Sequence, residues 1–256
     1  MAILIIVIAF SFALPLGLLL WWNGKKKPGL WPYIAGAICF ILFAMVLEAL
    51  LHQVCLGDNA VSTALNASPV LYILYGAFAA GIFEETGRLF GFRVLLKKRR
   101  EAPTAVAYGI GHGGIEVILV LGITYVTYLL ASAGVPVGDE ATTALLREAV
   151  GAISMPIAGA AMLERISTVM LHVGLSMLVF RAAKEKGKLG FYPLAILLHA
   201  AADVPAALYQ LGVIRSIATI EIFMLIFSIA CLLLGCRVLK NYHAQPEAGS
   251  GSTELE

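Results

Sequence analysis

The sequence predicts an all-α integral membrane protein, a polytopic bundle of about seven transmembrane helices. Hydrophobic residues make up 60% of the 256 residues and charged residues only 13%, whereas a soluble domain carries about 25% charged residues. The mean hydropathy is +0.90. Apolar runs of spanning length, about 20 residues, recur along the chain, and basic residues gather in alternate loops between them.

The first apolar run, residues 2–22, is expected to be a retained helix rather than a cleaved signal peptide. No basic segment precedes it, and Lys25, Lys26 and Lys27 follow it, which reverses the order found in a signal peptide. Glycine and proline inside the runs are compatible with membrane helices. The later runs cover residues 31–54, 70–96, 104–132, 151–180, 190–211 and 216–238.

The fifth run has an alternative division into two helices. Residues 142–163 and 164–183 could form separate spans, with Pro156 as a break, because proline interrupts a helix interior. The bundle would then contain eight helices rather than seven.

The distribution of charge predicts the orientation of the bundle. The loops at residues 55–69 and 133–141 contain Asp or Glu but no Lys or Arg. By the positive-inside rule the N-terminus then lies outside and the C-terminus inside, and we expect a bacterial cytoplasmic membrane. Residues 1–243 are interpreted as one transmembrane domain and residues 244–256 as a disordered polar tail. The basic clusters lie at residues 25–27, 93–100, 181–188 and 237–240.

Composition also excludes some classes of function. The net charge of +2, with the basic residues confined mainly to loops, gives no indication of a nucleic-acid partner. The lipid bilayer is the expected surrounding. The cysteines form no CxxC motif, so neither a disulfide framework nor a cysteine metal site is indicated. They are Cys39, Cys55, Cys231 and Cys236.

Two adjacent carboxylates, Glu84 and Glu85, lie in the middle of the run at residues 70–96. Ionised groups inside a membrane are costly and are typically functional. Arg88 follows within one helical turn, where it can hold the carboxylates ionised. We expect Arg88 to be a counter-ion, because arginine does not give up its proton.

Further ionisable residues lie inside three other runs at nearly the same depth. Counted from the basic-loop boundaries, they lie about 12–20 Å into the membrane, so we predict that they meet the Glu pair in one mid-membrane cavity reached from the cytoplasmic half. Arg165 is expected to pair with Glu164. Glu48 and His52 lie closer to the outer boundary and are expected to be structural. The residues at the shared depth are His112, His172 and His199; Asp203 is predicted to join the same cavity, and Glu116, Glu164 and Arg165 in the same runs are expected to support it.

This combination of residues fits hydrolysis of a peptide bond within the membrane. Either Glu84 or Glu85 could activate water as a general base. Histidines at the same level could bind Zn²⁺ or stabilise the oxyanion. Neither HExxH nor GxSxG occurs, so the common protease signatures are absent. Four glycines in residues 109–114 either ease helix packing or expose backbone to the substrate.

Four motifs in residues 70–210 resemble the YhfC-type intramembrane metalloproteases, relatives of the CPBP (CAAX protease and Abi) and PrsW groups. They are EETGR from Glu84, YGIGHGGIE from Tyr108, ER followed by His172, and HAAAD from His199. The resemblance implies that Glu84 activates water, while His199 and Asp203 orient the site or stabilise the oxyanion. It leaves open whether His112, His172 and His199 bind zinc or act without metal. Three departures from the wider superfamily are the Glu85–Arg88 spacing, Tyr108 in place of Phe, and Asp203 in place of Asn.

Two functions from different classes therefore remain. The first is an intramembrane endopeptidase that cleaves a membrane-embedded or lipid-anchored peptide. The alternative is a proton- or cation-coupled transporter, because Glu, His and Asp also line ion pathways. Inverted repeats would favour transport, and none is visible in the sequence. A non-catalytic interaction protein would not require these polar residues at one depth.

Overall fold

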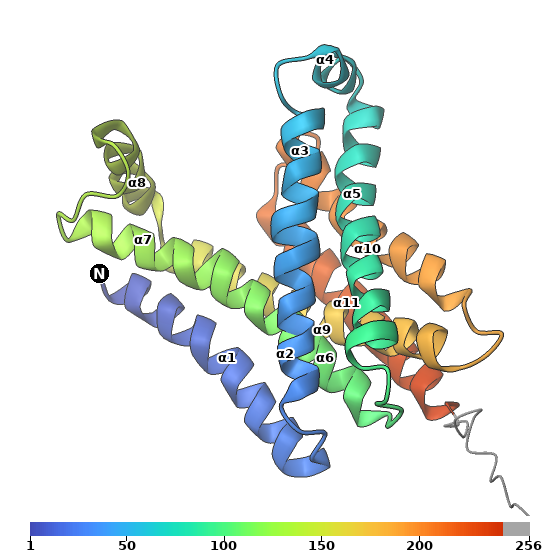
Figure 1. Cartoon of the computed structure of the whole chain (residues 1–256). Helices are drawn as coiled ribbons and strands as arrows, with labels where there is room; N and C mark the ends of the chain where they lie inside the picture. The colour runs from blue at the N-terminus through green and yellow to red at the C-terminus, as the bar shows by residue number, and fades with distance from the viewer. Residues whose placement is uncertain (243–256) are drawn as a thin grey trace, which may run out of the picture.

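The computed structural model describes residues 1–242, and every regular element in this range is a helix (Figure 1). This confirms the all-α class. Six helices are long and apolar enough to cross a membrane, and a seventh is added if one bent pair is counted. The expected tail at residues 244–256 lies outside the described residues.

The spans follow the predicted runs closely. Three of them contain π-helical turns, and the π-helices η2 and η3 begin shortly after Arg88 and directly after Glu116. Such turns frequently occur at functional sites. The spanning elements are α1 (Ala2–Lys26), α2 (Trp31–Phe40) with η1 (Ile41–Glu48) and α3 (Ala49–Cys55), α5 (Pro69–Phe90) with η2 (Gly91–Leu95), α6 (Pro103–Glu116) with η3 (Val117–Gly122) and α7 (Ile123–Ser132), α9 (Met155–Lys184), α10 (Phe191–Gln210) and α11 (Ile217–Lys240).

The start of α5 is fixed by local sequence. Ser68 caps the helix by accepting a hydrogen bond from the Leu71 amide, and Pro69 occupies the first turn, where its missing amide hydrogen is tolerated. The short helix α4 (Ala60–Asn66) precedes it and forms an angle of 111° with the span. The span that carries the Glu pair therefore begins at a well-defined corner.

The alternative with eight spanning helices is wrong. The break in the fifth run falls at Ile153 and Ser154, and Pro156 lies in the first turn of α9 rather than interrupting it. Before the break, α8 (Glu140–Ala152) has 13 residues, fewer than the roughly 20 needed to cross a bilayer.

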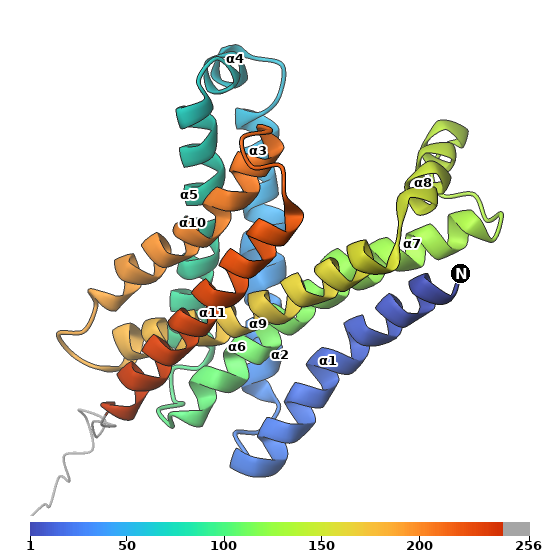
Figure 2. The same cartoon turned by 180° about the vertical axis from the view of Figure 1, so that it is seen from behind.

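Helix α9 forms the centre of the bundle. Its spanning window is 83% buried, whereas that of α11 is 17% buried. Helices α6, α10 and α11 pack around α9, while α5 runs beside α2 and α10 (Figures 1 and 2). Glycines of α6 allow close approaches to α2 and α9: a Cβ at Gly111 would lie 2.0 Å from the Tyr33 carbonyl oxygen, and one at Gly109 would lie 2.6 Å from Val173 Cα. At these positions glycine serves close helix packing.

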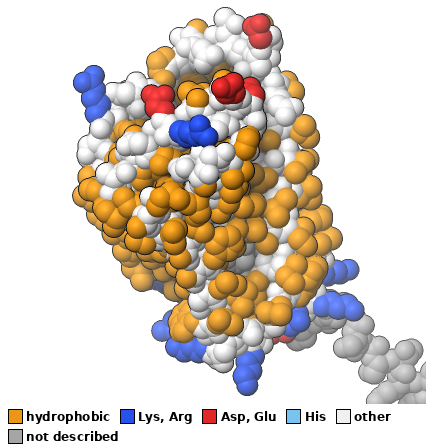
Figure 3. Space-filling model, turned by 90° about the vertical axis from the view of Figure 1, so that its left-hand side faces the viewer, with side chains coloured by type: hydrophobic (Ala, Val, Ile, Leu, Met, Phe, Trp, Pro, Cys, Tyr) orange, Lys and Arg blue, Asp and Glu red, His pale blue; other side chains and the backbone are white. Residues whose placement is uncertain are grey.

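The surface has an apolar middle and two polar ends. Figure 3 shows hydrophobic side chains across the middle of one face, with basic side chains at the lower end. We call the end formed by residues 55–69 and 133–141 the acidic-loop end. The opposite end, formed by residues 25–30, 96–102 and 185–190, is called the basic-loop end. Such an apolar band between polar ends fits a bilayer.

We expect the basic-loop end to face the cytoplasm. A cysteine introduced at Asp58 should react with a membrane-impermeant thiol reagent in intact cells, while one introduced at Lys98 should react only after permeabilisation. Cys55 and Cys236, which are not buried, are first replaced by serine. Labelling of both positions from the same side would contradict the predicted topology.

Candidate active site

The two neighbouring glutamates have different surroundings because adjacent residues on a helix point about 100° apart. Glu84 is 8% exposed and Glu85 is fully buried. His112 Nε2 donates a hydrogen bond of 2.8 Å to Glu84 Oε2. Glu85 is held by His199 Nδ1 at 2.8 Å and by Arg88 Nε at 3.0 Å. Glu84 is therefore the member of the pair that retains access to open space.

Two histidines from different helices are each oriented by a carboxylate. His172 of α9 donates from Nε2 to Glu116 Oε2 at 2.7 Å, and its Nδ1 lies 3.8 Å from Glu84. His199 of α10 donates from Nδ1 to Glu85, and its Nε2 lies 3.9 Å from Glu84. A carboxylate that holds the far nitrogen is typical of metal-binding histidines.

Glu84, His172 and His199 together could hold a metal ion, since their ligand atoms lie within 4.8 Å of one another. Two ligands of one tetrahedral zinc ion lie roughly 3.3 Å apart, so separations of 3.8 and 3.9 Å need only a small adjustment. His112 lies beside this group rather than within it. Of the three histidines expected as ligands, the structure thus brings two into the group, together with Glu84.

Arg88 connects α5 to α9 next to the Glu–His group. Its side chain is fully buried. Nη1 donates to the His172 carbonyl oxygen and to Ser176 Oγ, each at 2.6 Å, and Nη2 donates to His172 Nδ1 at 3.0 Å. No sequence motif pointed to Ser176; its only signal is that it lies one helical turn after His172.

The remaining predicted residues lie around this centre. Arg165 donates to Glu116 at 2.8 Å and also pairs with Glu164. Tyr108 is fully buried, and its hydroxyl donates to the Gly87 carbonyl at 3.3 Å. Asp203 follows His199 by one turn, with Oδ2 3.7 Å from His199 Nε2.

A cavity of about 130 Å³ lies against Glu84, Glu116, His172, His199 and Asp203. The structure thus brings these sequence-predicted residues to one place, while Glu85 and His112 lie behind them, in contact with Glu84 or its neighbours. Four carboxylates line the cavity, against one arginine. Such an excess of negative charge favours a bound cation.

The depth of these residues, counted from the basic loops, predicted that the cavity is reached from the basic-loop end, but the cavity does not extend in that direction. On the basic-loop side of Arg88 the helices are closed by the fully buried side chains of Phe92, Tyr108 and Phe180. The cavity extends in the other direction, to Ile220 near the start of α11 and Ala206 near the end of α10. Residue depth alone does not reveal which side is packed shut.

The fold and the site define a polytopic α-helical membrane protein with a buried Glu–His centre that is suited to a metal ion. Comparison with known families shows that the chain belongs to the YhfC intramembrane metalloprotease family, whose model matches residues 10–224. The chain is 34% identical over 229 residues to the "Uncharacterized membrane protein YhfC" of Bacillus subtilis (strain 168). That alignment covers 84% of this chain and 87% of the relative. No solved structure matches the chain.

Proposed function

We propose that this protein is an intramembrane endopeptidase in which Glu84, His172 and His199 hold a divalent metal ion. The observation that carries the proposal is the orientation of the two histidines. Each is fixed at one nitrogen by a carboxylate and directs the other nitrogen toward Glu84, at 3.8 or 3.9 Å. Membership of a family described as intramembrane metalloproteases supports the same conclusion.

The donor set fits zinc. Two imidazoles and one carboxylate form the ligand set of several catalytic zinc sites, which keep one position open, and here the group borders a cavity. His172 Nδ1 is an acceptor because Nε2 carries the hydrogen donated to Glu116, and its lone pair now accepts from Arg88 Nη2 at 3.0 Å. Binding a cation here would require Nδ1 to give up this hydrogen bond. When bound, zinc would polarise the scissile carbonyl and promote ionisation of water.

Glu84 is proposed as the general base. One carboxylate oxygen would help to hold the metal and the other would be the base: Oε2 is held by His112 and faces His172, which leaves Oε1 to accept a proton from water and return it to the leaving amine. Glu85 was the second candidate for this role, but its carboxylate is enclosed by Arg88 and His199. We therefore assign Glu85 to positioning His199.

The outer residues support this centre. Glu116 and Arg165, with Glu164, orient His172, and Tyr108 packs beside His112. Asp203 borders the cavity where a substrate would lie. A membrane-embedded or lipid-anchored peptide in a bacterial cytoplasmic membrane is the proposed substrate, and the motif order also supports a relation to the CPBP and PrsW groups.

Metal analysis of purified protein tests the proposal. Wild-type protein loaded with zinc should retain about one ion per chain, and His172→Ala should lower the affinity by at least about tenfold, since even outer-shell changes cost 10–100-fold. His52→Ala is the matched control, because His52 contacts Glu48 and Tyr75 and lies outside the group. Equal metal content in wild type and His172→Ala would rule out this centre.

A further inference from the structure

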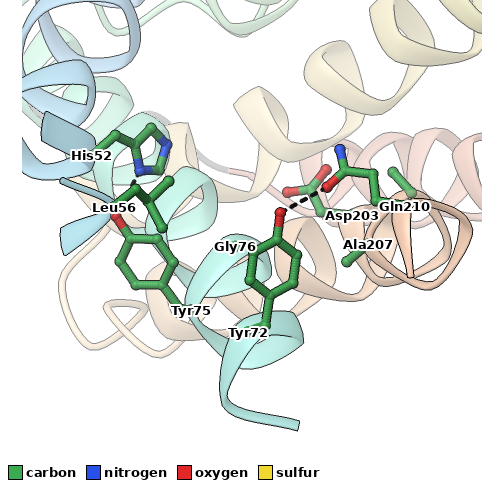
Figure 4. A pocket seen from close by; sticks show the side chains of 9 residues that line it. His52, Leu56, Tyr72, Tyr75, Gly76, Asp203, Ala207 and Gln210 are labelled. Carbon is green, nitrogen blue, oxygen red and sulfur yellow. Dashed lines mark hydrogen bonds between the residues drawn. The ribbon is translucent and has the colours of Figure 1, made fainter. Parts of the chain in front are cut away.

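A second cavity, of about 300 Å³, lies between α3, α5 and α10 at the acidic-loop end (Figure 4). Figure 4 shows two tyrosines of α5 facing across it, one toward α3 and one toward α10. Tyr75 bonds His52 at 2.6 Å, and Tyr72 donates to Gln210 at 3.1 Å. We call this cavity the vestibule; its lining includes His52, Tyr72, Tyr75, Gly76, Asp203 and Gln210.

The vestibule adjoins the catalytic cavity. Asp203 and Ala206 line both spaces, so a group that enters the vestibule passes Asp203 before it reaches Glu84. Tyr72 and Gly76 lie in the first two turns of α5, and Gln210 is the last residue of α10. The position of these residues places the open end of the path at the acidic-loop end of the bundle.

The vestibule is lined by hydrogen-bond acceptors and aromatic rings. None of its lining residues is Lys or Arg. Asp203 Oδ2 has no hydrogen-bond partner within the part of the chain that the structure describes. His199 Nε2 lies 3.7 Å from this oxygen. The ion-pair partner of His52 is a further carboxylate, Glu48.

A carboxylate beside aromatic rings is suited to a cation. Tyrosine faces attract ammonium and guanidinium groups, and a cleft with one sign of charge between apolar walls concentrates the opposite charge. The π-helix η1 ends at Glu48 and leaves this residue 9% exposed. The pair Glu48–His52, expected to be structural, thus forms part of the vestibule wall through His52.

We propose that the vestibule is the substrate entrance and a subsite for a positively charged side chain or amino group of the substrate. The peptide then reaches Glu84 from the acidic-loop end, with its cationic group held by Asp203 and the two tyrosines. The identity of the occupant as a substrate rests on the proposed protease function. The entrance and its preference for cations are properties of the folded chain and are measurable without cleavage.

Accessibility is tested with cysteines in full-length protein in sealed vesicles, after Cys55→Ser and Cys236→Ser. A side chain at Gly76 has open space, since an added Cβ meets no atom within 4 Å. The same is true at Gly151 in α8 and at Gly190 beside α10, which mark the acidic-loop and basic-loop ends. Gly76→Cys should react with an impermeant thiol reagent from the same side as Gly151→Cys, and Ala206→Cys should do the same.

Charge preference is tested with methanethiosulfonate reagents that carry a trimethylammonium or a sulfonate group. Relative to Gly151→Cys, the rate ratio of cationic to anionic reagent at Gly76→Cys should be higher by about tenfold or more. Adding Asp203→Asn should reduce this excess severalfold, because it removes the unpartnered carboxylate.

Three results would overturn the proposal: Gly76→Cys and Ala206→Cys both unreactive while Gly151→Cys reacts, reaction only from the Gly190 side, or a rate ratio no higher than that at Gly151. Cys39 and Cys231 are buried and unaltered in every variant, so they should stay unlabelled if the variant is folded. Normal labelling in a protein that neither binds metal nor cleaves peptide would refute the protease function alone. If the protein cleaves peptide but the vestibule fails these labelling tests, only the proposal that the vestibule is the substrate entrance is refuted.

Discussion

Glu84→Gln should lower the turnover number for peptide cleavage by roughly 10²–10⁴-fold, the usual contribution of a general base. Glutamine keeps the shape and a hydrogen-bond acceptor for His112 but cannot accept a proton. Turnover would be measured with purified protein in proteoliposomes, as the rate at which it cleaves a membrane-embedded substrate peptide. Glu221→Gln is the control, because Glu221 is also buried but lines neither cavity.

The response of the second glutamate makes this test specific. Glu85→Gln should reduce activity by displacing His199 and so weaken metal binding, but it leaves Glu84 able to accept a proton. Its loss of turnover should therefore be smaller than that of Glu84→Gln, which alters a metal-holding group and the general base together. If both variants cleave at the wild-type rate, the proposed mechanism is wrong. Proton or cation flux without cleavage in either form would instead support the transporter alternative.

Arg88→Ala should destabilise the folded protein by about 3–5 kcal/mol, the typical effect of removing one partner from a buried ion pair. The fully buried Glu85 carboxylate loses its guanidinium, and the His172 carbonyl and Ser176 lose a donor. Thermal unfolding in detergent would measure the change. Arg93→Ala is the matched control five residues along the same span, and its exposed side chain should contribute within about 0.5 kcal/mol.

A second substitution separates charge from packing. Glu85→Gln in the Arg88→Ala protein should recover part of the lost stability, because it removes the carboxylate that was left unpaired. No recovery, together with equal losses for Arg88→Ala and Arg93→Ala, would show that the ion pair contributes nothing to the fold.

Much of the architecture was predictable from the sequence because a bilayer imposes a simple rule. Backbone groups inside lipid must satisfy their own hydrogen bonds, so long apolar runs become helices. The run at residues 2–22 became α1, and the run at 190–211 became α10. The helix boundary near Pro156 was harder to predict, because a proline in the first turn of a helix and a proline that breaks a helix look alike in sequence.

The polar residues of the site were also recognisable from the sequence, because charges inside a membrane are too costly to be incidental. Their partners were not. His112 and Glu116 lie one turn apart, yet His112 bonds Glu84 and Glu116 bonds His172. Spacing along one helix determines which residues share a face, while packing between helices determines what that face meets.

The sequence by itself determined the all-helical membrane class and the set of ionisable residues inside the apolar runs. Only the tertiary structure decided that Glu84 borders the cavity while Glu85 is enclosed by Arg88 and His199, and that the cavity extends toward the acidic-loop end. The physical reason is that hydrophobicity and helical periodicity are properties of one segment. Exposure of a single carboxylate depends on the side chains that α6, α9 and α10 bring against it.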